Sequence, residues 1–287
     1  MIYLLLSILA STVIFVLFKL FDKHKVNTLQ AIVFNYVTAF FIGIITYEAP
    51  INIQAIHNTE WFYGAVFLGF LYITIFNFMA ITAQRVGLSV ASVATKMSVI
   101  IPVIFGIYVY HESAGLFKII GIIVALLAVY LASMKSGARI KNKRYILYPI
   151  IIFFGTGIID TSIKYIETTY LPDNGIPIFS ATIFCFSAII GFGLLIYQKL
   201  KGNFKFDSKS LWGGFALGIA NYASMYYILK ALNHETLESS TIFTVNNVAI
   251  ILLTSLLGYF LFKEKLSTKN WIGISLAVIS ILLVTAL

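Results

Sequence analysis

One lysine stands deep inside an apolar stretch of the sequence. Lys96 lies about eight residues into the run 88–110, and Ser89, Ser92 and Lys96 follow one another at spacings of three and four. Residues at these spacings share one face of a helix. A charged side chain at membrane depth costs at least about 2.5–3.5 kcal/mol on insertion scales, so it should face a cavity or a partner. We interpret Lys96 and Ser92 as candidates for binding an anionic group such as a carboxylate; the alternative is a lysine that pairs with Asp160 and only locks two helices.

An acidic residue occupies a similar place in the second half of the chain. Asp160 lies in the apolar run 145–166, and Lys164 follows one helical turn later. A carboxylate held in a poorly hydrated cavity can exchange a proton against substrate binding, as the intramembrane acids of many transporters do. Asp160 is therefore a candidate for proton coupling. The alternative is a local Asp160–Lys164 pair on the helix surface.

A second polar face is predicted in the run 238–262. Ser240, Thr244 and Asn247 follow at spacings of four and three, with Asn246 beside them. We predict that Thr244, Asn246 and Asn247 contribute to a binding site. The alternative is that these amides only join helices, for which the average contribution is about 0.6 kcal/mol. Four further candidates for the same site lie in other apolar runs: Tyr72, Asn77, Asn221 and Tyr226.

The elements that carry these residues are predicted to be membrane spans. The chain of 287 residues is 60% hydrophobic and only 11% charged, with a mean hydropathy of +0.95. Apolar runs of about 20 residues, separated by short charged loops, are typical of transmembrane helices. Reading with that length predicts an all-α polytopic membrane protein with ten spans: 2–20, 28–47, 61–83, 88–110, 115–133, 145–166, 175–198, 210–231, 238–262 and 268–286.

Charge in the loops predicts the orientation. Most of the 20 lysines and arginines lie between spans 1 and 2, 3 and 4, 5 and 6, 7 and 8, and 9 and 10, whereas the alternate loops carry acidic residues. Positive loops stay in the cytoplasm. We therefore expect both termini on the outer face of the cytoplasmic membrane of a prokaryote. The net charge of +9 has the same origin, and no nucleic-acid partner is expected.

The two halves of the sequence repeat each other. Gly106, Glu112 and the motif 120–122 are followed, 152 positions later, by Gly258, Glu264 and the motif 272–274. We predict a first five-helix repeat at 1–134, a basic linker at 135–144 and a second repeat at 145–287. Because five is odd, the two repeats must cross the membrane in opposite senses. Inverted repeats of this kind are common in secondary transporters, whose sites lie near mid-membrane between the halves.

The fourth and fifth spans and the ninth and tenth spans resemble the EamA-type repeat of the drug/metabolite transporter superfamily, ten-helix branch. The matching residues are Arg85, Ala91, Ser92, Ala94, Pro102, Glu112 and Gly121 in the first half, and Ser239, Ser240, Gly258, Glu264 and Gly273 in the second. Thr254 departs from the pattern at the place of Pro102, and Lys96 and the Asn246–Asn247 pair are additions to it. The resemblance implies the ten-helix fold and an exporter- or exchanger-like role, but no particular substrate.

These features predict a secondary transporter that moves a small polar metabolite, amino-acid-like or another carboxylate, by alternating access. Export or proton-linked exchange is the expected mode. One alternative is proton-coupled efflux of cationic drugs with Asp160 as the site. Another is a membrane scaffold or sensor that keeps the fold without transport, in which the buried charges should be tightly paired.

Enzymatic and metal-dependent functions are not expected. The four histidines lie near loops on both faces, and the sequence contains no zinc spacing, phosphate-binding glycine loop or nucleophile elbow. We therefore predict no catalytic residues, no metal and no cofactor. The expected partners are the lipid bilayer, a small-molecule substrate and protons, and the sequence leaves a homodimer open.

Overall fold

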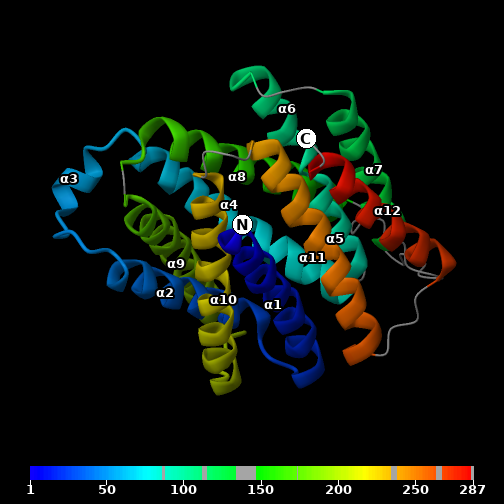
Figure 1. Ribbon diagram of the computed structural model, residues 1–287. Helices are drawn as coiled ribbons and strands as arrows, with labels where there is room; N and C mark the ends of the chain where they lie inside the picture. The colour runs from blue at the N-terminus through cyan, green and yellow to red at the C-terminus, as the bar shows by residue number, and fades with distance from the viewer. Residues whose placement is uncertain are drawn as a thin grey trace.

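The computed structural model describes residues 1–85, 88–111, 115–133, 147–172, 174–233, 238–262 and 267–285, and these residues form helices joined by short loops (Figure 1). The helices are α1 (Ile2–His24), α2 (Thr28–Ile45), α3 (Ile53–His57), α4 (Phe62–Arg85), α5 (Leu88–Met97), α6 (Ile100–Val109), α7 (Leu116–Ser133), α8 (Leu147–Tyr170), α9 (Ile176–Leu200), α10 (Ser208–Leu232), α11 (Ser239–Phe262) and α12 (Thr268–Thr285).

The predicted all-α polytopic membrane architecture is confirmed. Six helices of the described chain are long and apolar enough to cross a membrane, namely α1, α2, α4, α8, α9 and α11, and shorter apolar helical stretches lie in α5–α6, α7 and α12. The predicted span 210–231 coincides with α10, whose glycines, serines and Asn221 make it less apolar than those six. The short α3 lies in the loop between α2 and α4. The predicted linker 135–144 lies outside the described residues.

The predicted single span 88–110 is wrong in one respect, because two helices, α5 and α6, occupy it. Pro102 has no N–H to donate to the carbonyl of Ser98, four residues earlier. The N–H of Ile101 instead donates to the Ser98 carbonyl at 2.9 Å, and the N–H of Val99 donates to the Lys96 carbonyl at 3.3 Å. These tighter turns end α5 one residue after Lys96, so the lysine lies at the break between the two helices.

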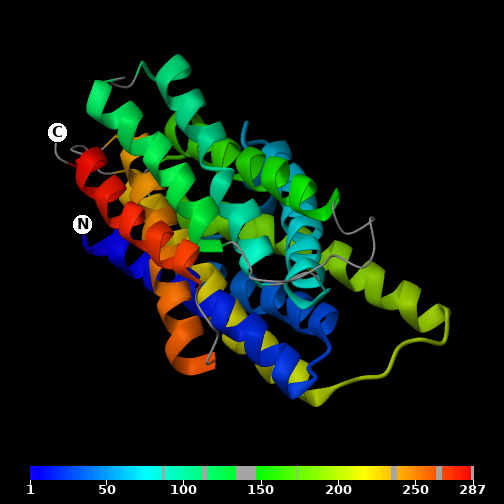
Figure 2. The ribbon, with the colours of Figure 1, turned by 90° about the vertical axis from the view of Figure 1, so that its right-hand side faces the viewer.

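Several packed helix pairs correspond when the two halves of the chain are exchanged. Helix α2 packs against α10 as α9 packs against α4, and α1 packs against α10 as α8 packs against α4. The pairs α2–α9 and α7–α12 each join two corresponding helices, and α7–α12 forms one side of the molecule (Figure 2). Helices α2 and α9 run antiparallel, because Gly43 near the end of α2 meets Ala181 near the start of α9, and Gly191 meets Val33.

Two glycines allow α2 and α10 to approach closely, as their small size predicts. A Cβ atom at Gly214 would lie 2.4 Å from Cβ of Phe34 and 2.7 Å from the carbonyl oxygen of Ala31. A Cβ atom at Gly218 would lie 2.5 Å from Cβ of Thr38. These contacts advance along both helices together, so α2 and α10 run parallel. Because α2 belongs to the first half and α10 to the second, the glycines lie at an interface between the halves.

Hydrogen bonds tie the starts of α2 and α10 together at what we call the stapled end, made of Asn27, Gln30, Lys205, Asp207 and Ser210. The Asp207 carboxylate accepts bonds from the backbone N–H of Asn27 (3.2 Å) and Lys209 (3.1 Å) and from the Ser210 hydroxyl (2.8 Å). It therefore lies at the N-termini of two parallel helices, where helix dipoles favour an anion. The bonds from Ser210 and from the Asn27 backbone lower the pKa of Asp207.

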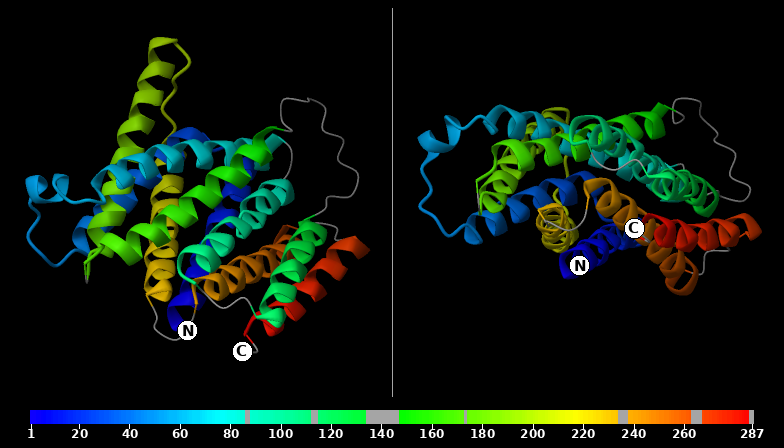
Figure 3. Two further views of the ribbon diagram at one scale, coloured as in Figure 1. Left: turned by 90° about the horizontal axis from the view of Figure 1, so that it is seen from above. Right: turned by 45° about the horizontal axis from the view of Figure 1, so that its top comes forward.

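The side chain of Gln30 completes the stapled end. Its amide nitrogen donates to the carbonyl of Lys205 at 2.6 Å, and its amide oxygen accepts from the N–H of Asp207 at 3.0 Å. The Ser210 hydroxyl also contacts the Asn27 carbonyl at 3.1 Å. Gln30 and Ser210 are fully buried. The last turns of α9 project from the rest of the helices and lead into this connection (Figure 3).

Candidate functional site

The two polar faces expected from the sequence meet in the structure. The Nζ atom of Lys96 donates a hydrogen bond of 2.9 Å to Oδ1 of Asn247, which joins α5 in the first half to α11 in the second. Lys96 is 8% exposed and Asn247 is 4% exposed. The ammonium group also lies 5.8 Å from the ring centroid of Phe15 in α1.

The bond to Asn247 roughly offsets the burial of this charge. A hydrogen bond to a charged group contributes about 1.5–3 kcal/mol, and a lysine at membrane depth costs about 2.5–3.5 kcal/mol on insertion scales. Within the described residues, the ammonium group donates no other hydrogen bond, so its remaining donors can bind a further acceptor. The arrangement therefore suits an ammonium that accepts an anionic ligand.

Within the described residues, two amide atoms at this bond are buried without a hydrogen-bond partner, Nδ2 of Asn247 and Oδ1 of the adjacent Asn246. Nδ2 of Asn221 on α10 is also buried without a partner there. Thr244 is fully buried on α11, one turn before Asn247. A buried amide without a partner costs about 1–3 kcal/mol, so unmet groups of this kind need an explanation. A polar ligand would supply one. The side chains of Ser92 and Ser240 lie outside the described residues.

Asp160 on α8 belongs to the same electrostatic neighbourhood. Its carboxylate interacts electrostatically with the charge of Lys96 and with the Tyr72 hydroxyl. In the described part of the chain, no ion pair joins Asp160 to Lys96 or to Lys164. The expected alternative of a local Asp160–Lys164 pair is wrong, because Lys164 pairs instead with Glu167 at 3.2 Å and donates to the Leu232 carbonyl at 3.3 Å.

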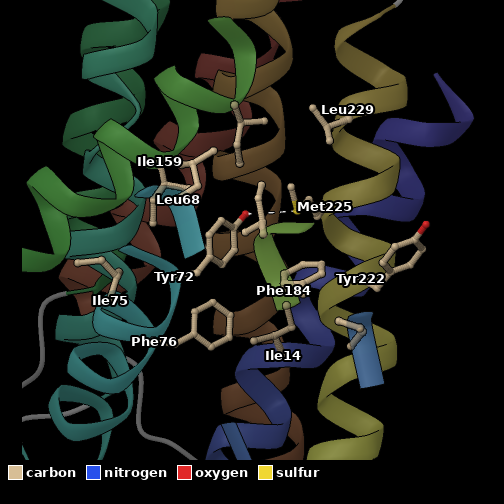
Figure 4. Packing of buried hydrophobic residues seen from close by; sticks show 14 of the residues in the cluster. Ile14, Leu68, Tyr72, Ile75, Phe76, Ile159, Phe184, Tyr222, Met225 and Leu229 are labelled. Carbon is tan, nitrogen blue, oxygen red and sulfur yellow. Dashed lines mark hydrogen bonds between the residues drawn. The ribbon is translucent and has the colours of Figure 1, made fainter. Parts of the chain in front are cut away.

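Tyr72 lies within an aromatic cluster between α4, α9 and α10 (Figure 4). Its hydroxyl donates to the sulfur of Met225 at 3.6 Å, and its ring packs edge-on against Phe184, with centroids 5.7 Å apart, and beside Phe76. Asn221 precedes Met225 by four residues and shares its face of α10. Asn221 thus lies on the face of α10 whose Met225 contacts Tyr72, and Asp160 interacts electrostatically with the same Tyr72 hydroxyl.

Two predicted site residues lie elsewhere. Asn77 donates to the carbonyl of Ile73 at 2.7 Å and lines a cavity at the stapled end, beside the connection between α1 and α2. Tyr226 stacks on Tyr222, with centroids 5.8 Å apart, and lines a cavity at the opposite end of the bundle. The sequence criterion was a polar residue within an apolar run. This criterion does not distinguish residues at the centre of the bundle from residues near its ends.

Two cavities of about 330 and 380 Å³ lie at what we call the open end, opposite the stapled end. Both are lined by Pro172, Asn174 and Lys230, so they adjoin each other around the connection between α8 and α9 and the last turn of α10. Glu167 and Lys164 line one cavity, and Glu48 lines the other.

Sequence reasoning missed the buried Lys164–Glu167 pair and the position of Lys230. A signal existed for the pair, because a spacing of three places both residues on one face of α8. The position of Lys230 depends on the fold of the connection between α8 and α9, which no local pattern predicts. Glu112 and Glu264, which the sequence suggested as anchors at helix ends, lie outside the described residues.

Comparisons with other proteins agree with the membrane architecture. The chain is 28% identical over 280 residues to an uncharacterized protein of Haemophilus influenzae, with 94% of this chain and 93% of that protein covered. A crystal structure described only as that of a protein shares the fold, with a TM-score of 0.74 and 13% identity over 99% of this chain and 96% of the other. The EamA-like transporter family matches residues 1–134 and 144–286. The chain is therefore a multi-pass membrane protein that belongs to the EamA-like transporter family.

Proposed function

We propose that the protein is a secondary transporter of a small carboxylate-bearing metabolite, amino-acid-like in size, in the cytoplasmic membrane of a prokaryote. The observation that carries the proposal is the buried hydrogen bond between Lys96 and Asn247. It joins the two halves, and the adjacent amide atoms, Nδ2 of Asn247 and Oδ1 of Asn246, have no hydrogen-bond partner within the described residues. A carboxylate would satisfy the ammonium group and the free Nδ2 of Asn247 together.

The transport cycle is proposed to be alternating access between two inverted repeats, 1–134 and 145–287, joined by the linker 135–144. The exchange of packing pairs between the halves and the antiparallel course of α2 and α9 support it. A site between inverted repeats can be reached from either side as one half rocks against the other. Export or proton-linked exchange is the proposed mode, and Asp160 is the proposed proton carrier because it lies near Lys96 without a direct ion pair.

The test of the site begins by finding the substrate. Metabolite profiling of cells that lack or overproduce the protein identifies compounds whose distribution it changes, and the strongest is then measured in proteoliposomes. Lys96→Ala should abolish its transport and leave the amount of membrane protein unchanged. Lys201→Ala, at an exposed lysine outside the site, is the matched control. Normal transport affinity in the Lys96 variant would contradict the anion-binding role.

Proton coupling is tested separately. Asp160→Asn keeps the size of the side chain and removes its titration, so proton-linked flux should stop or lose its dependence on pH. If the pH dependence in vesicles is the same as in the wild type, Asp160 has no part in coupling.

A second candidate function is efflux of lipophilic cations. It is favoured by one observation: Asp160 interacts electrostatically with Tyr72 and forms no ion pair within the described residues. A carboxylate and an aromatic ring are the groups that bind organic cations. Resistance of cells to such cations, lost in Asp160→Asn and kept in Lys96→Ala, would favour this function. The scaffold alternative predicts tightly paired buried charges, and in the described part of the chain no ion pair joins Lys96 to Asp160.

A further inference from the structure

Lys230 lies where the two cavities of the open end adjoin. Pro172, Asn174 and Lys230 line both cavities, and the combined lining includes two cations, Lys164 and Lys230, and two anions, Glu167 and Glu48. The space is larger than a single acetate or alanine molecule needs and is lined largely by polar groups. Its walls come from the ends of α2, α8 and α10 and from the start of α9.

Lys164 and Lys230 differ in the partners of their ammonium groups. Lys164 is buried, and its ammonium is held by Glu167 and by the carbonyl of Leu232. Lys230 forms no ion pair within the described residues, and its nearest assigned partner is the ring of Tyr226, 5.8 Å from Nζ to the centroid. The Tyr226 ring is itself stacked on Tyr222, which bonds to the Thr46 hydroxyl. Lys230 is thus a partly buried cation on a fixed aromatic wall, with unused donors beside two cavities.

One face of α8 carries charged residues from the centre of the bundle to this place. Asp160, Lys164 and Glu167 follow at spacings of four and three, and Lys164 and Glu167 line one of the cavities. At 1.5 Å per residue, Asp160 and Glu167 are about 10 Å apart along the helix. Asp160, which interacts electrostatically with Lys96, therefore lies about two helical turns from the cavity lining.

We propose that the open-end cavities form a docking site for a single carboxylate group, held by Lys230, which the substrate occupies on its way to or from Lys96. This inference rests on the proposed function and assigns it a second site. Glu48 and Glu167 would repel a second carboxylate on the same ligand, so monocarboxylates and zwitterions are the favoured class. The ring of Tyr226 orients the Lys230 ammonium.

The test measures protection of Lys230 from acylation. The purified full-length protein is treated with sulfosuccinimidyl acetate in potassium acetate, in potassium chloride of equal ionic strength, or in potassium chloride with acetamide, the uncharged counterpart of acetate. Labelling of Lys230 is then followed by mass spectrometry. At an acetate concentration of about twice Kd, labelling should slow about threefold. Lys201 is the internal control, because its ammonium also lies over a tyrosine ring, 4.6 Å from the centroid of Tyr197, but lines neither cavity.

Labelling of Lys230 that is equal in acetate and chloride, or slowed as much by acetamide, would overturn the docking site. Protection that disappears in Lys96→Ala would also overturn it, because acetate would then act through the central site. Protection that persists in Lys96→Ala supports two separate sites. The proposed function is tested separately, by transport. If the Lys96→Ala variant transports the substrate normally, the proposed function is contradicted, whatever the labelling of Lys230 shows.

Transport kinetics give a second readout. Lys230→Gln should raise the KM for the identified substrate and leave the maximal rate unchanged, because it weakens capture and spares the central site. Lys230→Arg keeps the charge and should restore a normal KM. A normal KM in Lys230→Gln, or a raised KM that arginine does not restore, would contradict a role of the Lys230 charge.

Discussion

The stapled end and the open end occupy corresponding places in the two halves, yet the contacts that join the halves differ between them. At the stapled end the starts of α2 and α10 are joined by directed hydrogen bonds of Gln30, Asp207 and Ser210. At the open end the corresponding starts of α9 and α4 meet through an edge-on contact of Trp61 and Phe179, with centroids 5.6 Å apart. Cavities adjoin the start of α9 there.

This difference shows which contacts must break for the halves to separate at each end. At the stapled end, several directed hydrogen bonds around Asp207 must be exchanged for bonds to water before the starts of α2 and α10 can part. At the open end, single hydroxyl pairs join the halves, Thr46–Tyr222 and Tyr110–Thr168, beside the aromatic contact of Trp61 and Phe179. The ion pair Lys164–Glu167 lies within one half.

The largest expected effect comes from the buried pair of the open end. Lys164→Met leaves the Glu167 carboxylate without its partner, and breaking a buried pair costs about 3–5 kcal/mol. The double variant Lys164→Met, Glu167→Leu should recover most of that loss, because no unpaired charge remains. Thermal unfolding in detergent measures both. A double variant no more stable than the single one would show that the pair is not what stabilises this end.

The next effect concerns the interface between the halves. Gly214→Ala places a Cβ atom against Phe34 and the Ala31 carbonyl, and overpacking of this kind costs about 1–3 kcal/mol. Gly193→Ala is the matched control in α9, because nothing lies within 4 Å of its added Cβ atom. Both variants gain the general helix-stabilising effect of alanine, so the difference between their thermal unfolding temperatures reports the overpacking at Gly214. Equal stability of the two variants would contradict the close approach of α2 and α10.

A smaller effect should follow from loosening the stapled end. Gln30→Ala removes two hydrogen bonds and leaves the N–H of Asp207 and the Lys205 carbonyl without these partners, at about 1–3 kcal/mol for each group that stays buried. Hydrogen exchange should then accelerate in residues 27–30 and 205–210 and stay unchanged around Lys230. Gln198→Ala is the control. Exchange that rises equally at both ends would contradict a local tie.

The smallest effect is a dependence on pH. Because the folded pKa of Asp207 is lowered, its stabilising contribution is present above the unfolded value of about 3.9 and is lost as the pH falls through the folded value. Hydrogen exchange at residues 27–30 should therefore accelerate below about pH 4. Asp207→Asn should remove this acid dependence. If the variant keeps the wild-type acid dependence, another group causes it.

The elements were predictable because membrane helices are encoded locally. Nine of the ten predicted spans each coincide with one helix, since apolar length decides where a chain can cross a bilayer. The one error, the break between α5 and α6, follows from Pro102, whose missing N–H was visible in the sequence. The effect of Pro102 at Lys96 depends on which backbone hydrogen bonds form around Ser98, and the sequence does not show these bonds.

The candidate site was only partly predictable. Helical spacing identified the faces that carry Lys96 and Asn247, but the same reasoning included Asn77 and Tyr226, which lie at opposite ends of the bundle. Spacing tells which residues share a face of one helix, and it does not tell how far that face lies from another helix. For the same reason, spacing could not identify the partner of Lys164, because Asp160 and Glu167 both lie one turn away from it. The structure shows that the partner is Glu167.

By itself, the sequence determined the apolar spans, the repeated halves and the helix faces on which the polar residues lie, because these depend on composition and on periodicity along one chain. Only the tertiary structure decided that Lys96 reaches Asn247 rather than Asp160, that one end is tied by hydrogen bonds, and that Lys230 lies between two cavities. Those arrangements depend on the crossing and relative depth of helices far apart in sequence, which are set by packing between the halves.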